Sequence, residues 1–489
     1  MGDEESRHGY TIDEALSTLG FGNFQGMALC FAGIGWFTDA MEISLLSFIG
    51  PAVKSKWLLS PTQESFLSSA VFGGMFLGAF FWGFISDSYG RRHAYKMGIR
   101  GVAIAMFGAG LLSAFSPDYT SLVIFRFFLG FGAGGGHVFS SWFLEFVPKS
   151  NRGTWMLVIS VFWILGEMLE ASLAWIIMPR LGWRWLLALS SLPSLTALLL
   201  SYFVPESPRY LFTKGRINEA TIVLEKVALI NRKELPTGNL QNYLQLHEEN
   251  APSEETHLRP SNEKKATSFQ TWFQPLFELF SSDLRRTTLL LWFLSFVNTF
   301  EYYGLQLMIS SLSSGESDCG PLNSILSKNF QNHNLYVNSF IAYLAELPGL
   351  VIAGLFVDRL GRKLSMEMLL MVGVIVMLPL LSHVNGTVIT ALLVSAWTVL
   401  SAAFAILAIY GKEVYPTSAR ASGWGLATAV RRIGGVVCPL IAVELVRGCH
   451  QTLAVIMFET VILISIVCVI FFPFETKGRG LKDIVSNTD

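Results

Sequence analysis

Residues 83–92 read GFISDSYGRR, and residues 354–363 read GLFVDRLGRK. Both stretches fit the pattern G-x-x-x-D-x-x-G-R-(R/K), and their aspartates, Asp87 and Asp358, are 271 residues apart. The glycines allow a tight turn at these positions. A chain of 489 residues that repeats such a loop in its second half indicates an internal duplication.

A second pattern, E-x-x-P-x-x-x-R, is also duplicated. It runs from Glu145 to Arg152 and again from Glu413 to Arg420, and its two glutamates are 268 residues apart. The two offsets are nearly equal, so the duplication extends beyond a single loop. In a membrane protein, two parallel halves around a site at the bilayer midplane are typical of a transporter.

The composition excludes a soluble protein. Hydrophobic residues make up 52% of the chain, charged residues only 15%, and the mean hydropathy is +0.48. Soluble domains carry about 25% charged residues. A net charge of −1 does not favour nucleic-acid binding. The chain has no phosphate-binding loop of the G-x-x-x-x-G-K-(S/T) type and no cysteine spacing of a metal site. We therefore expect a membrane protein that is not an enzyme and has no cofactor or metal.

Apolar stretches long enough to cross a bilayer number twelve. They lie at residues 27–50, 64–86, 95–116, 119–143, 153–177, 183–204, 286–311, 336–357, 364–383, 387–411, 421–445 and 450–472.

The polar segments divide the chain into five parts. These are an N-terminal segment (1–26), a six-helix bundle (27–204), a linker (205–285), a second six-helix bundle (286–472) and a tail (473–489). The linker begins with an amphipathic piece and continues as a polar stretch of the kind that stays partly disordered. The fold class is thus an all-α membrane protein with twelve transmembrane helices in two pseudo-symmetric bundles.

The short loops on the side of the termini carry more lysine and arginine than the loops on the other side. This bias predicts that both termini are cytoplasmic. A single sequon, Asn385-Gly386-Thr387, falls in an outer loop and agrees with that orientation. We expect a monomer in a lipid bilayer, either the plasma membrane or an internal one such as the vacuolar membrane.

The duplicated loops resemble the signatures of the major facilitator superfamily, with Ser88 where the first copy usually has arginine. The segments PESPR at 205–209 and FETKG at 474–478 resemble the tags of its sugar porters and organic cation transporters. YTIDEA at 10–15, GWFTDAME at 35–42 and YYGL at 302–305 are similar to a narrower group. That group contains bacterial nicotinate permeases, relatives of synaptic vesicle glycoprotein 2 and plant organic cation/carnitine transporters. The resemblance implies alternating access driven by a proton or sodium gradient.

The loop motifs suit a set of ion pairs that holds the inner ends of the helices together when the protein is open to the outside. Glu145 and Glu413 at the helix ends would accept hydrogen bonds from Arg152, from Arg420 or from the arginines of the first duplicated loop. The alternative is a plain positive-inside anchor, which would not need acidic partners at this spacing. The gating residues in this interpretation are Asp87, Arg91, Arg92, Glu145, Arg152, Asp358, Arg359, Arg362, Glu413 and Arg420.

Charges at mid-helix depth are expensive in a bilayer and indicate functional positions. Acids outnumber bases among them: Asp39, Glu42, Glu167, Glu170, Glu301, Glu346 and Glu459 against Arg126, Arg431 and Arg432. Some of these carboxyls must therefore be protonated or hydrated in a cavity.

The sequence predicts that Asp39 pairs with Arg126 and takes up the coupling proton. This first-helix aspartate and fourth-helix arginine resemble the protonation switch of proton-coupled sugar porters. A static ion pair that only fixes helix packing is the alternative. Glu167 and Glu170 are further candidates for proton coupling.

The predicted substrate site combines a cation with aromatic rings and acids. Either Arg431 or Arg432 would clamp a substrate carboxylate; the two lie about 100° apart on a helix, so we expect only one to point squarely into the cavity. A pair of this arginine with Glu444 or Glu459 is the alternative. The ring or positive nitrogen of the substrate would be held by residues among Tyr302, Trp36, Glu42, Glu301, Asn298 and Glu346.

These residues predict a transporter of a small aromatic carboxylate or zwitterion, such as nicotinate or N-methylnicotinate. It would be coupled to protons, with sodium left open. An organic cation or carnitine carrier is the first alternative, with the acids dominant. A non-transporting receptor is the second, and the short loop at about 312–335 argues against it because the related vesicle glycoproteins carry a large outer domain there.

Overall fold

The structure is a computed structural model, and most of the residues that it describes are helical. It describes residues 9–88, 94–150, 152–213, 215–241, 279–313, 336, 339–341, 343–382, 386–416, 419–447 and 451–478.

The first half of the membrane part contains long helices joined by short connections. They are α2 (Asn23–Trp57), α3 (Pro61–Ser88), α4 (Ala94–Ala114), α5 (Tyr119–Ala133), α6 (His137–Leu144), α7 (Arg152–Leu181), α8 (Trp183–Ser190) and α9 (Leu192–Leu200). The second half repeats this order. Its elements are α14 (Ser282–Ser313), α16 (Glu346–Leu360), α17 (Arg362–Met377), the 3-10 turn η3 (Leu378–Leu381), α18 (Gly386–Val414), α19 (Arg420–Arg447) and α20 (Gln451–Ile470).

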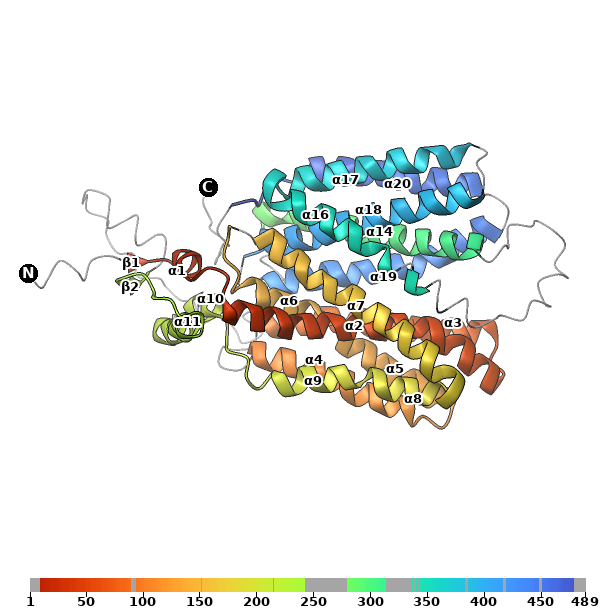
Figure 1. The fold of residues 1–489 in the computed structure, drawn as a ribbon, viewed down its shortest axis with the longest axis horizontal. Helices are drawn as coiled ribbons and strands as arrows, with labels where there is room; N and C mark the ends of the chain where they lie inside the picture. Colours follow the sequence, from red (N-terminus) through yellow and green to blue (C-terminus); the bar gives the residue numbers. More distant parts are fainter. Residues whose placement is uncertain are drawn as a thin grey trace, which may run out of the picture.

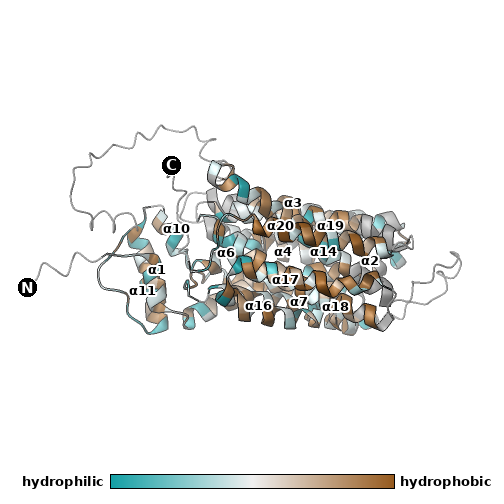
Figure 2. Ribbon diagram, turned by 90° about the horizontal axis from the view of Figure 1, so that it is seen from above, coloured by the Kyte–Doolittle hydropathy of each residue, from teal (hydrophilic) through white to brown (hydrophobic). Residues whose placement is uncertain are grey.

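The two halves form two bundles that lie side by side (Figure 1). Helix α3 packs against α19, and α7 packs against α16 and α18, so these helices form the interface between the halves. Hydrophobic residues are frequent along the helices of both bundles, and hydrophilic ones are more frequent toward the end where α1, α10 and α11 lie (Figure 2). The predicted fold of two six-helix bundles is confirmed, with each predicted stretch lying on one helix or on two consecutive ones.

Several predicted stretches are interrupted, among them 364–383, where α17 gives way to η3 at Leu378. The stretch 119–143 breaks into α5 and α6 at Gly134–Gly136, and the stretch 183–204 breaks into α8 and α9 at Ser191. At the break between α5 and α6, a β-carbon on Gly134 would lie 2.4 Å from the Met75 carbonyl oxygen, so glycine is needed for α3 to approach this closely.

Hydropathy alone accounts for most of the membrane helices. Among the described residues, eight helices are long and apolar enough to cross a bilayer, and two shorter apolar segments lie at Phe66–Trp82 and Gly98–Ala114. Helices α14 and α19 are not among these. These two helices pack against each other and carry polar side chains into the space between the bundles.

A small cluster of elements sits beyond one end of the bundles. It contains β1 (Gly9–Tyr10), α1 (Ile12–Leu19), α10 (Pro208–Thr213), α11 (Ile217–Asn231) and β2 (Asn239–Leu240). The strands β1 and β2 pair in parallel, and Leu16, Leu224 and Leu240 are among the residues of a shared apolar core. We call the end of the bundles next to this cluster, where α2 begins and both duplicated motifs lie, the motif end (Figure 1).

This cluster differs from the prediction of a plain N-terminal segment and linker. Helix α11 covers the amphipathic piece of the linker, but its apolar face packs on α1. Segments more than 200 residues apart in sequence thus build one core, and neither segment shows this by itself. The polar stretch 242–278 lies outside the described residues.

Candidate functional site

A cavity lies between the two bundles. About 990 Å³ of space free of protein atoms, open solvent included, lies between its lining residues. Its walls come from α2, α5, α6 and α7 of the first half and from α14, α16, α18 and α19 of the second. The site is therefore shared between the halves, as expected for a duplicated carrier.

Seven residues singled out from the sequence line this cavity. They are Trp36, Asp39, Asn298, Tyr302, Glu346, Arg431 and Arg432. The sequence did not single out Phe404, Trp424 or Thr428, which line it too. Trp424, Thr428 and Arg431 follow at helical spacing along one face of α19, and this pattern could have revealed them.

Both arginines of α19 line the cavity, whereas the prediction allowed only one to face it squarely. The Arg431 guanidinium lies over the Phe404 ring, 4.8 Å from its centroid, and Arg432 is buried. Long side chains bend around the helix and so reach the same space from neighbouring positions. Within the described part of the chain, neither guanidinium forms an ion pair, and Glu459 does not partner Arg432.

The predicted pair of Asp39 and Arg126 is wrong for this structure. The Arg126 guanidinium donates to Glu42 at 2.9 Å, and both side chains are only 1% exposed. Glu42 lies three residues further along α2 than Asp39, level with Arg126 on α5. Glu42 forms an ion pair with Arg126 and does not line the cavity, so its predicted role in substrate binding is not supported.

Asp39 instead faces the cavity, where the charged groups acting on it include Arg432 and Arg431. A β-carbon on Gly136 would lie 1.5 Å from Asp39 Oδ2, so the break between α5 and α6 makes room for this carboxylate. Asp39 Oδ1 has no hydrogen-bond partner among the described residues.

Two other predicted acids lie away from the cavity. Glu301 accepts a hydrogen bond from Ser465 of α20 at 3.5 Å, and Glu170 accepts one from Ser190 at 2.8 Å. Both are fully buried in their own bundles and do not line the cavity. The spacing along a helix did not predict which neighbour each of these side chains meets.

Glu346 and Glu167 approach each other from opposite halves. Glu346 accepts hydrogen bonds from the Tyr302 hydroxyl at 2.7 Å and from Trp397 Nε1 at 3.0 Å. Glu167, on α7, is buried, and Glu346 is the charged side chain that acts on it. Of these two acids, Glu346 lines the cavity and Glu167 does not.

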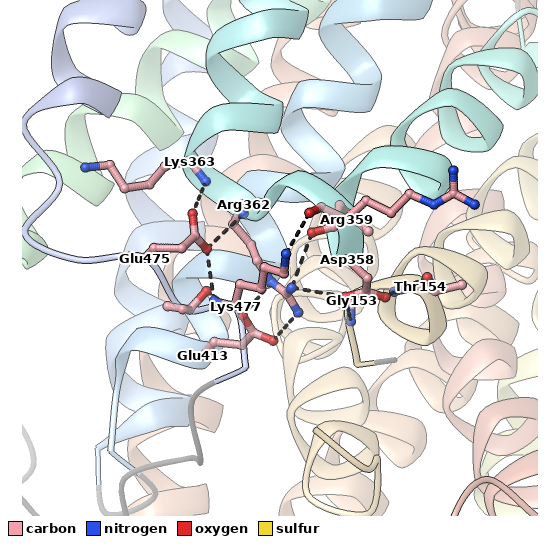
Figure 3. A network of polar contacts seen from close by, with 11 residues as sticks. Gly153, Thr154, Asp358, Arg359, Arg362, Lys363, Glu413, Glu475 and Lys477 are labelled. Atoms are coloured by element: carbon pink, nitrogen blue, oxygen red, sulfur yellow. Dashed lines mark hydrogen bonds and ion pairs between the residues drawn. The ribbon is translucent and has the colours of Figure 1, made fainter. Parts of the chain in front are cut away.

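Arg362 is the centre of a polar network at the motif end of the second half (Figure 3). It makes a bidentate pair with Glu413, with both distances 2.9 Å, and donates to Asp358 at 3.0 Å. Glu475 accepts from the backbone N–H groups of Arg362 and Lys363 at 2.9 Å each and so caps α17. Through Glu475, the segment FETKG at 474–478 thus binds to this network.

Asp358 also crosses to the first half (Figure 3). It accepts from the backbone N–H of Gly153 at 3.1 Å and from the N–H and hydroxyl of Thr154 at 2.7 and 2.6 Å. An acid at the N-terminus of α7 is favoured by the helix dipole. A β-carbon on Gly153 would lie 2.5 Å from Asp358 Oδ1, so this contact needs glycine.

An ion pair makes the second cross-contact. Arg420 NH1 lies 3.1 Å from Glu145 Oε1, with the two side chains 1% and 4% exposed. This is one of the partners that the motif predicted for Glu145. Arg359 is exposed, and its carbonyl oxygen accepts from Lys477. Arg91 and Arg92 lie outside the described residues, as does the side chain of Asp87.

Ion pairs of the first half hold the cluster of β1, α1, α10, α11 and β2, here called the α1 cluster, against the motif end. Asp13 pairs with Arg209, and Arg152 NH2 lies 3.7 Å from Asp13 Oδ1. Burial alone would raise the pKa of Asp13, but Arg209 and Arg152, helped by Lys149, lower it below its ordinary value. The carboxylate is therefore held ionised beside the motif end.

The halves also touch at the opposite end of the cavity. The Ser44 hydroxyl of α2 donates to the Tyr343 hydroxyl at 3.0 Å, and the Phe48 and Tyr336 rings lie 5.5 Å apart. The cavity thus has cross-contacts between the halves on both sides along the bundle axis.

Comparison with known proteins gives consistent results. A model of the family "Sugar (and other) transporter" matches residues 31–487. The chain is 49% identical to organic cation/carnitine transporter 7 of Arabidopsis thaliana, covering 99% of this chain and 98% of that protein. It is 33% identical to the synaptic vesicle 2-related protein of Xenopus laevis, covering 97% and 82%.

Among solved structures, the proton:xylose symporter XylE bound to 6-bromo-6-deoxy-D-glucose matches with a TM-score of 0.70 at 18% identity. The match covers 95% of this chain and 98% of that one, and it shows a common fold. With a family model over nearly the whole chain and a relative at 49% identity, the protein belongs to the sugar (and other) transporter family of the major facilitator superfamily.

Proposed function

We propose that the protein carries a small zwitterion with a positive nitrogen and a carboxylate, by alternating access, and that carnitine is the first candidate. The observation that carries this proposal is the cavity wall. Two arginines of α19, which form no ion pair with any described residue, lie there together with aromatic rings and the acids Asp39 and Glu346. A carboxylate suits the arginines, and an alkylated ammonium suits the aromatic faces. A simple cation would leave both guanidinium groups uncompensated.

The name of the Arabidopsis relative supports carnitine over the aromatic acids that the sequence placed first. N-methylnicotinate is the second candidate because it carries the same two charges on a flat ring. The neighbouring rings of Trp36 and Trp163, 5.8 Å apart, and of Tyr302 and Tyr303, 5.5 Å apart, offer it faces to pack on. Nicotinate has the carboxylate without the fixed positive nitrogen and ranks third.

The test is uptake of labelled carnitine, N-methylnicotinate, nicotinate and choline into proteoliposomes. We expect carnitine to enter fastest, N-methylnicotinate to compete with it, and choline to be a poor substrate because it has no carboxylate for the arginines. Preferred uptake of choline would overturn the zwitterion assignment. Uptake of nicotinate alone would instead support an aromatic carboxylate as the substrate, as the sequence predicted.

We further propose that the motif end is cytoplasmic and that the contacts of Asp358 and Glu145 across the halves form the inner gate, closed in this structure. Both contacts join residues of one half to helix ends of the other, so the halves must separate there before the cavity opens. Rocking of two rigid halves around a central site requires such separable contacts.

Coupling to protons would act through Asp39. This carboxylate shares the cavity with Arg431 and Arg432, and Glu42 and His137 are the other titratable groups close to it. An ionised Asp39 competes with the substrate carboxylate for the arginines, so its protonation would free them for the substrate. Glu167, next to Glu346, is a second candidate for the proton.

The Asp39→Asn variant tests the coupling. We expect it to exchange labelled for unlabelled carnitine at a rate close to that of the wild type, while its uptake no longer responds to an imposed pH gradient. The measurement is counterflow and gradient-driven uptake on the same vesicles. Loss of both activities together with loss of folded protein would instead indicate a purely structural role.

A further inference from the structure

Lys412 is a buried lysine that no motif explains. It lies on α18, one turn beyond Ala408 of the cavity wall, and is 1% exposed. Its ammonium group lies 4.9 Å from the ring centroid of Trp36 and 5.7 Å from that of Trp424. Both tryptophans line the cavity, so Lys412 sits behind them on the way to the motif end.

The charge of Lys412 has no acidic partner. In the described part of the chain its ammonium makes no ion pair and no hydrogen bond, and the charged group that acts on it is Arg431, which is also a cation. Two aromatic faces offset part of the cost of burying an ammonium group, but they do not neutralise it. An anion placed next to this ammonium group would therefore be stabilised, and the described residues do not supply one.

Lys412 lies between the cavity and the motif end, on the route that a substrate would take through that end. Trp36 belongs to the first half, whereas Lys412 and Trp424 belong to the second. One step further toward the motif end, Arg420 Nε donates to the Lys412 carbonyl at 3.0 Å and joins Lys412 to the gate pair with Glu145. When the halves separate at this end, Trp36 moves away with the first half and uncovers the ammonium.

We propose that Lys412 is a second carboxylate subsite, which receives the substrate's carboxylate from Arg431 and Arg432 when the inner gate opens. This proposal rests on the proposed function, since it requires a substrate with a carboxylate. It divides the path into a binding site in the cavity and a release site behind the two tryptophans. Lys412 would thus set the rate of inward passage and not the affinity of the first encounter.

The test separates binding from passage. For Lys412→Met, we expect the Kd for carnitine to stay within about twofold of the wild type, while the uptake rate falls about tenfold or more through loss of one charge-assisted contact. Lys412→Arg keeps the charge and should retain most of the uptake. Lys226→Met, the same substitution on an exposed position of α11, is the matched control and should change neither quantity.

Other outcomes decide against the subsite. Wild-type uptake in Lys412→Met would overturn it, as would a Kd that worsens in step with the rate. If the wild type binds no carboxylate-bearing substrate at all, the proposed function itself fails, and this result is distinguishable because it needs no Lys412 variant.

A measurement on the wild-type protein covers the case in which Lys412→Met does not fold. Reductive methylation of lysines, followed by mass spectrometry, reports how accessible Lys412 is during turnover. We expect carnitine to protect Lys412, whereas carnitine amide, which lacks the carboxylate, should not. Equal methylation with and without carnitine would refute the subsite.

Discussion

Replacing Arg420 by methionine is expected to lower uptake by about a hundredfold or more, because it leaves Glu145 as a buried charge without its cross-bundle partner. Removing one member of a buried ion pair costs about 3–5 kcal/mol. Only the closed gate needs this pair, so the cost falls on the closed state and shifts the protein toward the inward-open one. Labelling of a cysteine introduced at Ser401, a cavity position, should rise when an impermeant thiol reagent is added from the motif end.

The control for this prediction is the double variant Glu145→Gln/Arg420→Met. It removes both charges, so no unpaired ion remains, and we expect it to recover much of the lost uptake. Double variants in which a buried pair becomes neutral are often nearly as stable as the original. If the double variant were as inactive as Arg420→Met, the hydrogen bond from Arg420 to the Lys412 carbonyl would be the more important contact.

The fold could be predicted because its signals are local and repeated. The duplicated loops place turns at the motif end of both halves, and apolar stretches of sufficient length fix the helices between them. Helices α14 and α19 were predicted from the apolar stretches 286–311 and 421–445, although neither is among the eight helices that qualify over the described residues. Their polar side chains are the reason that they line the cavity.

The candidate site could be predicted only in part. Trp36, Tyr302 and Arg432 were predicted to lie in the cavity because each is near the middle of a predicted helix, and all three do line it. The sequence could not decide between Asp39 and Glu42 as the partner of Arg126, since the two acids differ by less than one turn. That choice depends on the local break between α5 and α6, where Gly136 makes room for Asp39.

Lys412 and the α1 cluster escaped prediction for a different reason. Lys412 stands directly before Glu413 of the duplicated motif and could be taken for one more positive charge at the inner surface. Its burial depends on Trp36, which comes from the other half of the chain. Contacts between distant segments have no periodicity, so a pattern search along one chain does not detect them.

Replacing Arg432 by methionine is expected to weaken carnitine binding by about 10- to 150-fold, because it removes a charge-assisted hydrogen bond of about 1.5–3 kcal/mol to the carboxylate. Choline has no carboxylate, so its binding should stay the same or improve once a repelling charge is gone from the cavity. The measurement is the Kd of both ligands for the purified variant and the wild type.

Arg431→Met is the matched control for Arg432. Arg431 also lines the cavity, but its guanidinium stacks on Phe404, so less of its charge is free for the substrate and a smaller loss of carnitine affinity is expected. Equal losses for carnitine and choline in the Arg432 variant would mean that this arginine supports the packing of α14 against α19. A loss confined to carnitine, and larger at Arg432 than at Arg431, would make Arg432 the residue that distinguishes a zwitterion from a cation.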